Sequence, residues 1–271
     1  MFGSRGIEIK TPDQLRLMQR SGAIVAEALA EARAAVRPGV TPRDLDSICE
    51  RVIRGRGATP NFLGYHGFPA TICASVNDVI VHGIPGDQPL AEGDVISIDC
   101  GAVLDGWHSD SAITVGVGEI RPEVAELLRV TEESMWRGIA AIRQGGKVGD
   151  IGHAVEGYVR SQGEYGIVEE YVGHGIGTAL HQPPNVPNFG RPGHGPKITR
   201  GMALAIEPML TLGAIENRTL ADDWTVVTTD GSWAAHFEHS VGVFADGLVV
   251  LTAPDGGQAE LERLGAAYAN T

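Results

Sequence analysis

The sequence predicts an α+β fold in which one unit occurs twice, giving two antiparallel half-sheets covered by helices and related by a pseudo-twofold axis. Two observations predict this arrangement. A long helical pattern followed by a short one occurs at residues 12–36 and 41–54, and again at 122–142 and 149–161. An apolar strand pattern that ends in a carboxylate follows each pair, at Asp99 and at Glu207. We expect a single domain over residues 1–271, with repeat halves at about 7–118 and 119–252.

The two halves also match residue by residue. Three matches occur in the same order in both halves: residues 37–57 align without gaps to 143–163, residues 82–84 (His-Gly-Ile) recur as 174–176, and residues 108–110 (His-Ser-Asp) recur loosely as 236–238 (His-Phe-Glu). Each match alone is weak, but their shared order supports a duplication. A duplicated unit often places its site where the two halves meet.

Capping signals mark the beginnings of the first two helices. Thr11 precedes Pro12 and lies three residues before Gln14, which is the spacing of a capping box with proline at the first helical position. Apolar residues then recur at helical spacing to about residue 36. Thr41-Pro42 opens a second pattern in the same way. These signals predict two successive helices in the first half.

The segments between the helix pairs predict strands. Residues 95–104 and 107–117 flank Asp105-Gly106, which is a strong two-residue hairpin signal. Hairpins imply antiparallel pairing. The other expected segments are strands at 202–212, 224–229, 234–244 and 248–252, and a Gly/Pro-rich loop at 181–196.

The expected hairpin fixes where two carboxylates point. A two-residue turn pairs Leu104 with Trp107, which places Asp110 opposite Gly101. Asp99 lies two residues from Gly101, so Asp99 and Asp110 are diagonal neighbours on one face of the sheet. Two carboxylates at that spacing are close enough to share a cation. Asp99 also follows an apolar run, and a carboxylate in a buried strand needs a partner.

Two further acids occupy similar places in the second half. Glu207 follows the apolar residues 203–206, and Glu238 lies inside another expected strand. A single acid in a buried strand is more often a hydrogen-bonded or ion-paired core group. Four acids, two per half, favour a different interpretation, because arginines are absent between Arg56 and Arg121. Two divalent ions would neutralise four carboxylates, and oxygen ligands with an imidazole suit Co, Mn, Fe or Zn.

Composition excludes several classes of partner. The net charge is -13 and no Lys/Arg-rich run occurs, so a nucleic-acid or anionic-membrane surface is not expected. No segment has the length and apolarity of a signal peptide or a membrane span. The three cysteines form no CxxC pair, which favours a reduced cytosolic compartment over a disulfide framework. Cys49 and Cys100 are expected to be small buried residues.

These motifs carry a resemblance to a known family. The chain resembles the type I methionine aminopeptidases, which are pita-bread metallopeptidases. The matching segments follow the family's order from about residue 7 to 252: 64–69 (Gly-Tyr-His-Gly-Phe-Pro), 77–85 (Asn-Asp-Val-Ile-Val-His-Gly-Ile-Pro), 98–99 (Ile-Asp), 105–106 (Asp-Gly) with 109–110 (Ser-Asp), 173–177 (Gly-His-Gly-Ile-Gly), 206–209 (Ile-Glu-Pro-Met) and 237–239 (Phe-Glu-His). Together they are highly specific, although Gly-His-Gly alone would not be.

The resemblance implies a single catalytic domain with a dinuclear metal centre. Its implied ligands are Asp99, Asp110, His174, Glu207 and Glu238. Asp110 and Glu238 would bridge the two ions, and Glu207 would also be the general base. A metal-bound hydroxide would attack the first peptide bond, while His82 and His181 contact the scissile amide. The implied activity is hydrolytic removal of the initiator methionine when the second residue is small.

The resemblance also implies an apolar pocket for the methionine side chain. The residues that map to this pocket are Tyr65, Phe68, Cys73 and Trp224, with Phe62 and Leu180 also facing it. Leu180 replaces an aromatic residue expected before His181, and Phe62 stands where a smaller residue is common. Plain core packing is the alternative role for Phe62. The roles of His108 and His236 stay open.

The implied partners follow from the same resemblance. They are the N-terminal methionine of peptides and nascent chains, with the ribosome as a candidate partner, no direct nucleic-acid contact and no membrane. A cytoplasmic monomer is expected. The short spacings between His174, Glu207 and Glu238 leave no room for the insertion of the type II enzymes. Because Phe2 is large, the protein is expected to keep its own Met1.

Two alternatives remain open from the sequence. An Xaa-Pro peptidase would share the fold, but those relatives usually carry an extra N-terminal domain. A metal-free interaction protein would keep the fold and lose catalysis, and it should show broken ligand positions. All five implied ligands are present here.

Overall fold

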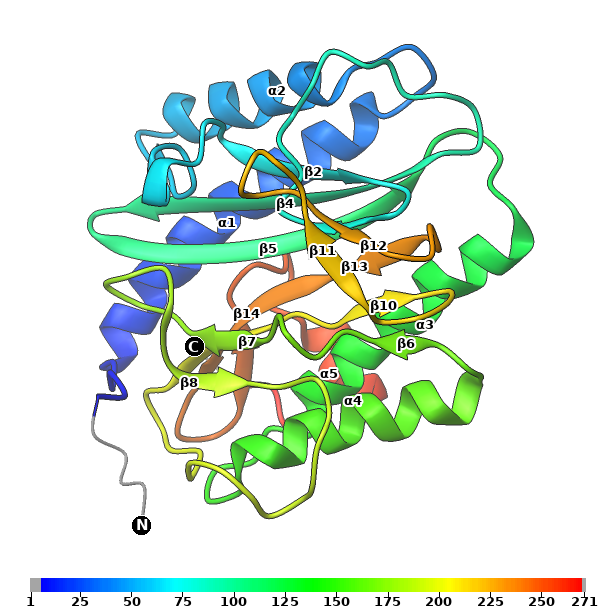
Figure 1. Cartoon of the computed structure of the whole chain (residues 1–271). Coiled ribbons are helices and arrows are strands. Elements are labelled where there is room, and N and C mark those ends of the chain that lie inside the picture. Colours follow the sequence, from blue (N-terminus) through cyan, green and yellow to red (C-terminus); the bar gives the residue numbers. More distant parts are fainter. Residues whose placement is uncertain (1–5, 270–271) are drawn as a thin grey trace.

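The computed structural model describes residues 6–269 (Figure 1). The expectation about Met1 and Phe2 lies outside these described residues. The described α-helices are α1 (Pro12–Ala35), α2 (Pro42–Gly55), α3 (Pro122–Ala140), α4 (Val148–Gln162) and α5 (Gln258–Arg263). A short 3-10 helix, η1, covers Tyr65–Gly67.

The helix predictions are confirmed. Thr11 accepts a hydrogen bond from the Gln14 backbone N–H at 3.3 Å, and the Gln14 side chain accepts one from the Thr11 N–H at 2.8 Å. Thr41 and Asp44 form the same reciprocal box at the start of α2. Each box satisfies two backbone donors that a helix N-terminus otherwise leaves unpaired. The long-then-short helix pair therefore occurs in both halves of the chain.

The strands are short except for one central hairpin. In chain order they are β1 (Thr59–Pro60), β2 (Ile72–Val76), β3 (Val79–Val81), β4 (Val95–Leu104), β5 (Trp107–Gly116), β6 (Gly166–Ile167), β7 (Gly173–Gly175), β8 (Gln182–Val186), β9 (Ala203–Ile206), β10 (Met209–Thr211), β11 (Asn217–Thr219), β12 (Val226–Thr228), β13 (Ala234–His236), β14 (Glu238–Val243) and β15 (Leu248–Val250).

The two halves of the chain share one nine-stranded sheet. Its order is β1-β4-β5-β14-β9-β7-β8, with β2 paired to β4 and β15 paired to β14. Strand β5 of the first half pairs antiparallel with β14 of the second half, so the halves join at the centre of the sheet. In Figure 1, α1 and α2 lie with the first-half strands and α3, α4 and α5 lie with the second-half strands. The predicted α+β pita-bread fold is confirmed.

The central hairpin has the register that its turn predicts. Leu104 pairs with Trp107 and Gly101 pairs with Asp110. Asp105 has φ 52° and Gly106 has φ 81°, the positive values that a two-residue hairpin turn of this twist requires. The turn sequence therefore sets which face of β4 and β5 each acid occupies.

Two predicted strands are wrong in extent, because each is interrupted. The segment 202–212 divides into β9 and β10 at Glu207-Pro208, and the segment 234–244 divides into β13 and β14 at Phe237. Pro208 has no N–H to donate, so a ladder cannot continue unchanged through it. Strands β10 and β13 pair with each other in a separate three-stranded sheet. The expected loop at 181–196 is also wrong in part, since it contains β8.

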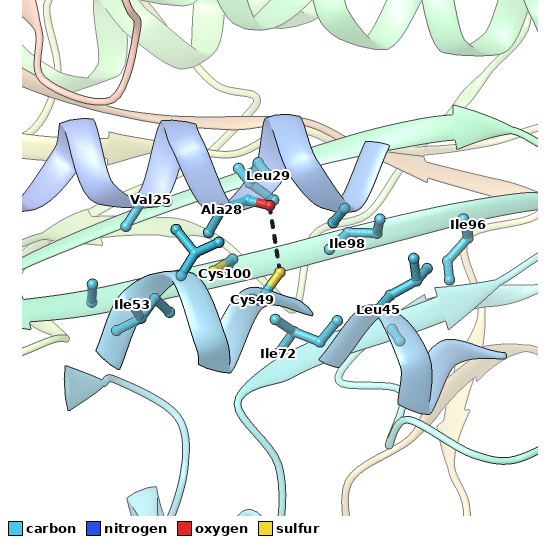
Figure 2. Packing of buried hydrophobic residues seen from close by; sticks show 14 of the residues in the cluster. Val25, Ala28, Leu29, Leu45, Cys49, Ile53, Ile72, Ile96, Ile98 and Cys100 are labelled. Carbon is cyan, nitrogen blue, oxygen red and sulfur yellow. Dashed lines mark hydrogen bonds between the residues drawn. The ribbon is translucent and has the colours of Figure 1, made fainter. Parts of the chain in front are cut away.

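Each half has its own apolar core. Helices α1 and α2 pack with β2 and β4 around Val25, Leu45, Ile53 and Ile98, as Figure 2 shows. The thiol of Cys49 lies in this core and donates to the Ala28 carbonyl at 3.7 Å (Figure 2). The second core, between α3, α4 and the strands of the second half, includes Ile139, Ile151, Leu204, Ile206 and Val241.

The expectation for Cys49 and Cys100 is confirmed, because both are fully buried free thiols. A hydrogen bond with Cys49, together with burial, raises the pKa of the Cys100 thiol. No described helix combines the length and apolarity needed to cross a membrane.

Helix α1 approaches the turn after β15 very closely at Gly22. A Cβ on Gly22 would overlap the carbonyl oxygen of Leu251. Gly157, in the interior of α4, is exposed and has nothing within 4 Å of the position of a Cβ. These two helical glycines therefore predict opposite responses to the same substitution.

We expect Gly22→Ala to lower the free energy of unfolding by about 1–3 kcal/mol, because the added methyl group would push α1 away from the backbone at Leu251. Gly157→Ala should leave stability unchanged or raise it by about 0.5–1 kcal/mol, because alanine favours helix. Urea unfolding of both variants measures the difference. Equal stability of the two variants would contradict the close approach of α1 to Leu251.

Candidate metal centre and substrate pocket

A row of paired residues crosses four strands at the centre of the large sheet. Cys73 in β2 pairs with Asp99 in β4, Asp99 pairs with Ala112 in β5, and Ala112 pairs with Glu238 in β14. Directly paired side chains lie on the same face of a sheet, as do residues two apart in one strand. Asp99, Glu238 and Asp110 therefore face the same side, as the hairpin predicts for Asp99 and Asp110.

Small residues leave room for these carboxylates. Ala112 separates Asp99 from Glu238 in the row and presents only a methyl group. Gly101 lies opposite Asp110, and a Cβ there would come within 3.0 Å of Asp110 Oδ1 and overlap the Asn61 amide. Asn61 donates to the Ser109 carbonyl at 3.0 Å, which holds the neighbouring strand. Ala112 and Gly101 thus leave space on this face of the sheet for the three acids.

His174 lies between two glycines in β7. A Cβ on Gly173 would overlap the Ala205 carbonyl, and one on Gly175 would overlap the Pro183 carbonyl, so these positions allow the close approach of β9 and β8. The His174 Nδ1–H donates to the Gly175 carbonyl at 3.0 Å. In a neutral ring this leaves Nε2 with a free lone pair. That Nε2 lies 3.4 Å from Glu207 Oε1.

Glu207 stands where β9 ends, at the strand break before Pro208. Asn188 donates to its backbone carbonyl at 3.1 Å. Its second carboxylate oxygen lies 3.9 Å from His236 Nε2, which is too long for a hydrogen bond. His236 is 2% exposed and its Nε2 has no hydrogen-bond partner. Glu207 therefore lies between two imidazoles.

Burial raises the pKa of all four acids, and neighbouring acids raise the pKa of three of them further. Burial is the largest cause and raises the pKa of Asp99 to about 7. Burial, with the nearby charges of the other acids, raises the pKa of Asp110, Glu207 and Glu238 well above their ordinary values. In the described part of the chain no lysine or arginine pairs with any of them; the ion pairs of Glu207 are to His174 and His236.

Several buried polar atoms of the cluster have no partner. Asp99 Oδ1, Asp110 Oδ1 and Glu238 Oε1 are buried without a hydrogen bond among residues 6–269. An unpaired buried charge is costly unless a counter-charge compensates it. Oxygen donors together with an imidazole nitrogen are the ligands that first-row divalent cations accept. The residues present therefore fit divalent metal ions.

Two groups of side chains bring ligand atoms within 4.8 Å of one another. One group is Asp110, His174 and Glu238, and the other is Glu207, His236 and Glu238. Glu238 belongs to both. Asp99 lies in neither group, although it is next to Asp110 on the sheet face. His236, whose role the sequence leaves open, joins the second group.

One cavity of about 140 Å³ contains every residue that the sequence singles out for the site. Its wall is formed by Phe62, Tyr65, Phe68, Cys73, His82, Asp99, Asp110, His174, Leu180, His181, Glu207, Trp224 and Glu238. The wall thus combines four acids and His174 with aromatic and aliphatic side chains, so a polar centre and an apolar pocket share one space.

The aromatic side chains of the pocket pack edge to face. Phe68 contacts Phe62 with ring centroids 6.5 Å apart and Trp224 at 5.0 Å. Such contacts favour a fixed ring arrangement over a mobile one. Phe62 is thus packed against a neighbouring ring and also lines the cavity. The core-packing alternative and the pocket role are compatible for this residue.

Two further histidines, His82 and His181, line the cavity and contact neighbouring rings. His181 Nδ1 is 2.8 Å from the Tyr65 hydroxyl, and its ring meets the His174 ring at a centroid distance of 4.4 Å. His82 has φ 60° and packs against Trp224 and Tyr171. Burial lowers the pKa of His82 to about 4 and also lowers the pKa of His181. Both rings are therefore neutral near pH 7 and can donate one hydrogen bond each.

Hydroxyl groups that sequence reasoning missed hold the acids in register. The Ser240 hydroxyl donates to the Asp110 carbonyl at 2.8 Å and accepts from the Asp110 N–H at 3.1 Å. The Ser111 hydroxyl donates to the Glu238 carbonyl at 2.6 Å. His239 lies behind them, with Nδ1 2.8 Å from the Thr252 hydroxyl. Isolated serines in strands carry no sequence signal for this role.

Comparison with known proteins agrees with this arrangement. The model of metallopeptidase family M24 matches residues 16–245. "Methionine aminopeptidase 1" of Mycobacterium tuberculosis is 51% identical over 256 residues, covering 92% of this chain and 96% of that protein. "Methionine aminopeptidase" of Clostridium acetobutylicum is 48% identical over 247 residues, covering 91% of this chain and 98% of that protein.

Solved structures show the same similarity. The methionine aminopeptidase of Rickettsia prowazekii superposes with a TM-score of 0.89 at 39% identity, covering 91% of this chain and all of that one. The prolidase of Pyrococcus furiosus has a TM-score of 0.73 at 20% identity, covering 90% of this chain and 65% of that one. The latter likeness is one of fold alone.

The raised pKa values predict how the metal-free protein responds to pH. Between about pH 4 and their raised pKa values, which reach about 7 for Asp99, the four acids bind more protons in the folded protein than in the unfolded chain. The buried histidines, whose pKa values are lowered, oppose this effect below about pH 6.5, where the unfolded chain protonates them. Above that pH the acids dominate, so stability falls as pH rises toward 8. We expect the metal-free Tm to be lower at pH 8 than at pH 6, and Mn²⁺ to raise Tm more at pH 8. Scanning fluorimetry at both pH values measures this. An equal Mn²⁺ increment at the two pH values would contradict the mutual repulsion of the acids.

Proposed function

Because this chain belongs to metallopeptidase family M24, we propose that it is a metal-dependent aminopeptidase that removes the N-terminal methionine of proteins and peptides. The cleaved substrates have a small second residue. One observation carries the proposal: the five carboxylate and imidazole side chains and the apolar pocket line the same cavity. Relatives 51% and 48% identical over nine-tenths of this chain bear the name of that activity.

We further propose that two divalent ions occupy the cluster. The ligands proposed for them are Asp99, Asp110, His174, Glu207 and Glu238. Four acids with raised pKa values and three unpartnered buried oxygens support two positive ions rather than one. Co, Mn, Fe and Zn all fit the donor set. When bound, such ions would supply the positive charge that polarises a peptide carbonyl and lowers the pKa of water.

The chain's own residues have distinct proposed roles around that centre. Glu207 accepts the proton of the attacking water as general base, because its carboxylate is at the strand break and faces the cavity. His82 and His181 lie at the border between the centre and the pocket. Their neutral rings donate hydrogen bonds to the carbonyl of the first peptide bond and stabilise the oxyanion as it forms.

The pocket accounts for a preference for one apolar side chain at the chain end. Phe62, Phe68 and Trp224 form an aromatic wall, with Tyr65, Cys73 and Leu180 completing it. Thioether sulfur contacts aromatic edges favourably, so a methionine side chain suits this wall. Leu180 presents a smaller surface than an aromatic residue would, which widens the pocket beside His181. The cavity volume of about 140 Å³ leaves room for a side chain and not for a folded segment.

The alternatives have less support. An Xaa-Pro peptidase is favoured by likeness of fold alone, at 18–23% identity to solved prolidases and related peptidases, of which this chain covers 61–65%. A metal-free interaction protein would have no need to keep buried, unpartnered carboxylates in a row, because they destabilise the fold without a counter-charge.

We propose that the protein acts in the cytoplasm as a monomer on nascent chains, with the ribosome as a candidate partner. The net charge of -13 argues against direct contact with nucleic acid. The substrate's free α-amino group is cationic, and the acidic cluster at the cavity suits it.

A peptide panel tests the activity directly. The purified protein, loaded in turn with Co²⁺, Mn²⁺, Fe²⁺ or Zn²⁺, should release methionine from Met-Ala-Ser and leave Met-Leu-Ser and Ala-Pro-Ser intact. Chelation should abolish release, and the divalent ion should restore it. Metal analysis after dialysis should give about two ions per chain. Cleavage of Ala-Pro-Ser with Met-Ala-Ser untouched would overturn the proposal in favour of the Xaa-Pro activity.

The border histidines give a second test. His82→Ala and His181→Ala should each lower kcat on Met-Ala-Ser by about 100-fold, the usual effect of removing one donor to a developing oxyanion. Metal content should stay unchanged, because neither residue is a proposed ligand. His153→Ala, an exposed histidine on α4, serves as the control and should leave kcat unaltered. Loss of metal from the His82 or His181 variants would contradict the division of roles.

A further inference from the structure

We propose that Glu8 is a positioning residue for the substrate-facing segment 179–181, which carries Leu180 and His181. The proposal rests on the proposed function, since those two residues line its cavity. Glu8 lies outside the cavity wall, on the short segment before α1. It acts on substrate only through the residues that it holds.

The Glu8 carboxylate accepts hydrogen bonds from the residues at both ends of this segment. Its Oε2 accepts from the Thr178 N–H at 3.2 Å and from the Thr178 hydroxyl at 2.9 Å. The same oxygen accepts from the Gln182 side-chain amide. Gln182 also donates to the Thr178 hydroxyl at 3.3 Å, which closes the ring of contacts. One carboxylate thus fixes the two residues that flank 179–181.

The hydrogen bonds from Gln182 and Thr178, with a smaller effect of the buried Lys10, favour the charged form of this carboxylate by lowering its pKa. The Lys10 side chain is 1% exposed, its Nζ lies 3.9 Å from Glu8 Oε2, and it donates to the Glu8 carbonyl at 3.3 Å. Burial lowers the pKa of Lys10 to about 8, against the opposing effect of Glu8. Burial would raise the pKa of Glu8, but the hydrogen bonds from Gln182 and Thr178 and the charge of Lys10 lower it overall. Charged acceptors form the stronger hydrogen bonds.

The segment that carries Glu8 is itself anchored to the sheet. The Lys10 N–H donates to the Gly201 carbonyl at 2.7 Å, and the Gly201 N–H donates to the Val243 carbonyl at 2.8 Å in β14. Gly177 allows the side chains of Glu8 and Lys10 to lie close to the chain just before Thr178, because a Cβ there would lie 2.5 Å from Lys10 Cε and 2.6 Å from Glu8 Oε2. Glu8 therefore connects residues 178–182 to a segment that is itself anchored to the sheet.

The held segment presents two side chains to the cavity. Leu180 is 1% exposed and forms part of the pocket wall. His181 is held by the Tyr65 hydroxyl at 2.8 Å and by the His174 ring at a centroid distance of 4.4 Å, and its neighbour Gln182 pairs with Gly175 in β7. The Glu8 contacts add a restraint at both ends of 179–181, so their release would loosen Leu180 and His181 without freeing them. Substrate binding should therefore weaken more than the chemical step slows.

The experiment compares Glu8→Ala and Glu8→Gln in the full-length, metal-loaded protein. Glu8→Ala should raise KM for Met-Ala-Ser about 10-fold with kcat within about 3-fold of the parent. Glu8→Gln should raise KM less, because its amide carbonyl can still accept from Thr178. Glu27→Ala is the matched control: it removes a carboxylate paired with Arg56 between α1 and α2, far from the segment, and should leave KM unchanged.

Hydrogen exchange supplies a readout that needs no activity. Amides of residues 178–182 should exchange about 10-fold faster in Glu8→Ala, while amides of α1 and β14 keep their protection. Gly177→Ala, which pushes Glu8 and Lys10 away from the other side, should reproduce both the KM rise and the local exchange.

Two results would overturn the proposal: unchanged exchange at 178–182 with unchanged KM, or faster exchange spread evenly over the chain with a lowered Tm. If the parent protein cleaves no methionine peptide with any metal, the proposed function fails. The exchange result at 178–182 still decides whether Glu8 holds the segment.

Discussion

Four buried carboxylates meet in one cavity, three on a face of the large sheet and Glu207 at the end of β9, and the cost of burying their charges beside one another is the constraint around which the structure is arranged. Antiparallel pairing aligns Asp99 and Glu238 across Ala112, and Asp110 lies two residues along the same strand. Such a cluster raises the energy of the folded chain unless positive charge enters it. Divalent cations that enter the cluster would therefore stabilise the folded chain, and the apolar pocket lies beside the same cluster.

The duplication explains how the chain delivers the acids to one place. Strands β5 and β14 are each half's contribution to the central pair, so the two halves meet along the row of acids rather than at its edge. Interruptions in the second-half strands then change the direction of the chain at Glu207 and just before Glu238. Pairing in the second half is thus interrupted at Glu207 and at Phe237, the residue before Glu238, whereas Asp99 and Asp110 lie within an unbroken hairpin.

Local signals predicted most of the fold. The capping boxes at Thr11 and Thr41 and the hairpin turn at Asp105-Gly106 have the structure expected of them, because each depends on neighbours in sequence. The break at Pro208 has a local signal, because proline cannot donate to a strand ladder. The break at Phe237 has none, and only the partner strands show that two sheets share the segment 234–244.

The positions of the candidate site residues followed in part from the same hairpin register. Their gathering with Phe62, Leu180 and Trp224 in one cavity needed the family resemblance, since no spacing rule relates residues so far apart in the chain. The roles of Ser111, Ser240 and Glu8 were not predicted. Each forms a hydrogen bond with a partner at least 100 residues away. The sequence around a single hydroxyl or carboxylate does not indicate which distant group it will bond to.

The pairing of β5 with β14 has a consequence for biosynthesis. Until β14 emerges, β5 is an edge strand, and the hairpin that holds Asp99 and Asp110 has an open ladder beside it. A sheet joined from strands so distant in sequence is slow to assemble, because the entropic cost of closing the long loop comes before the stabilising contacts form. Cation capture is then a late event that follows closure of the sheet. A chain truncated before Glu238 would lack both the final acid and the strand that seals the edge, so partial products of translation carry no functional centre.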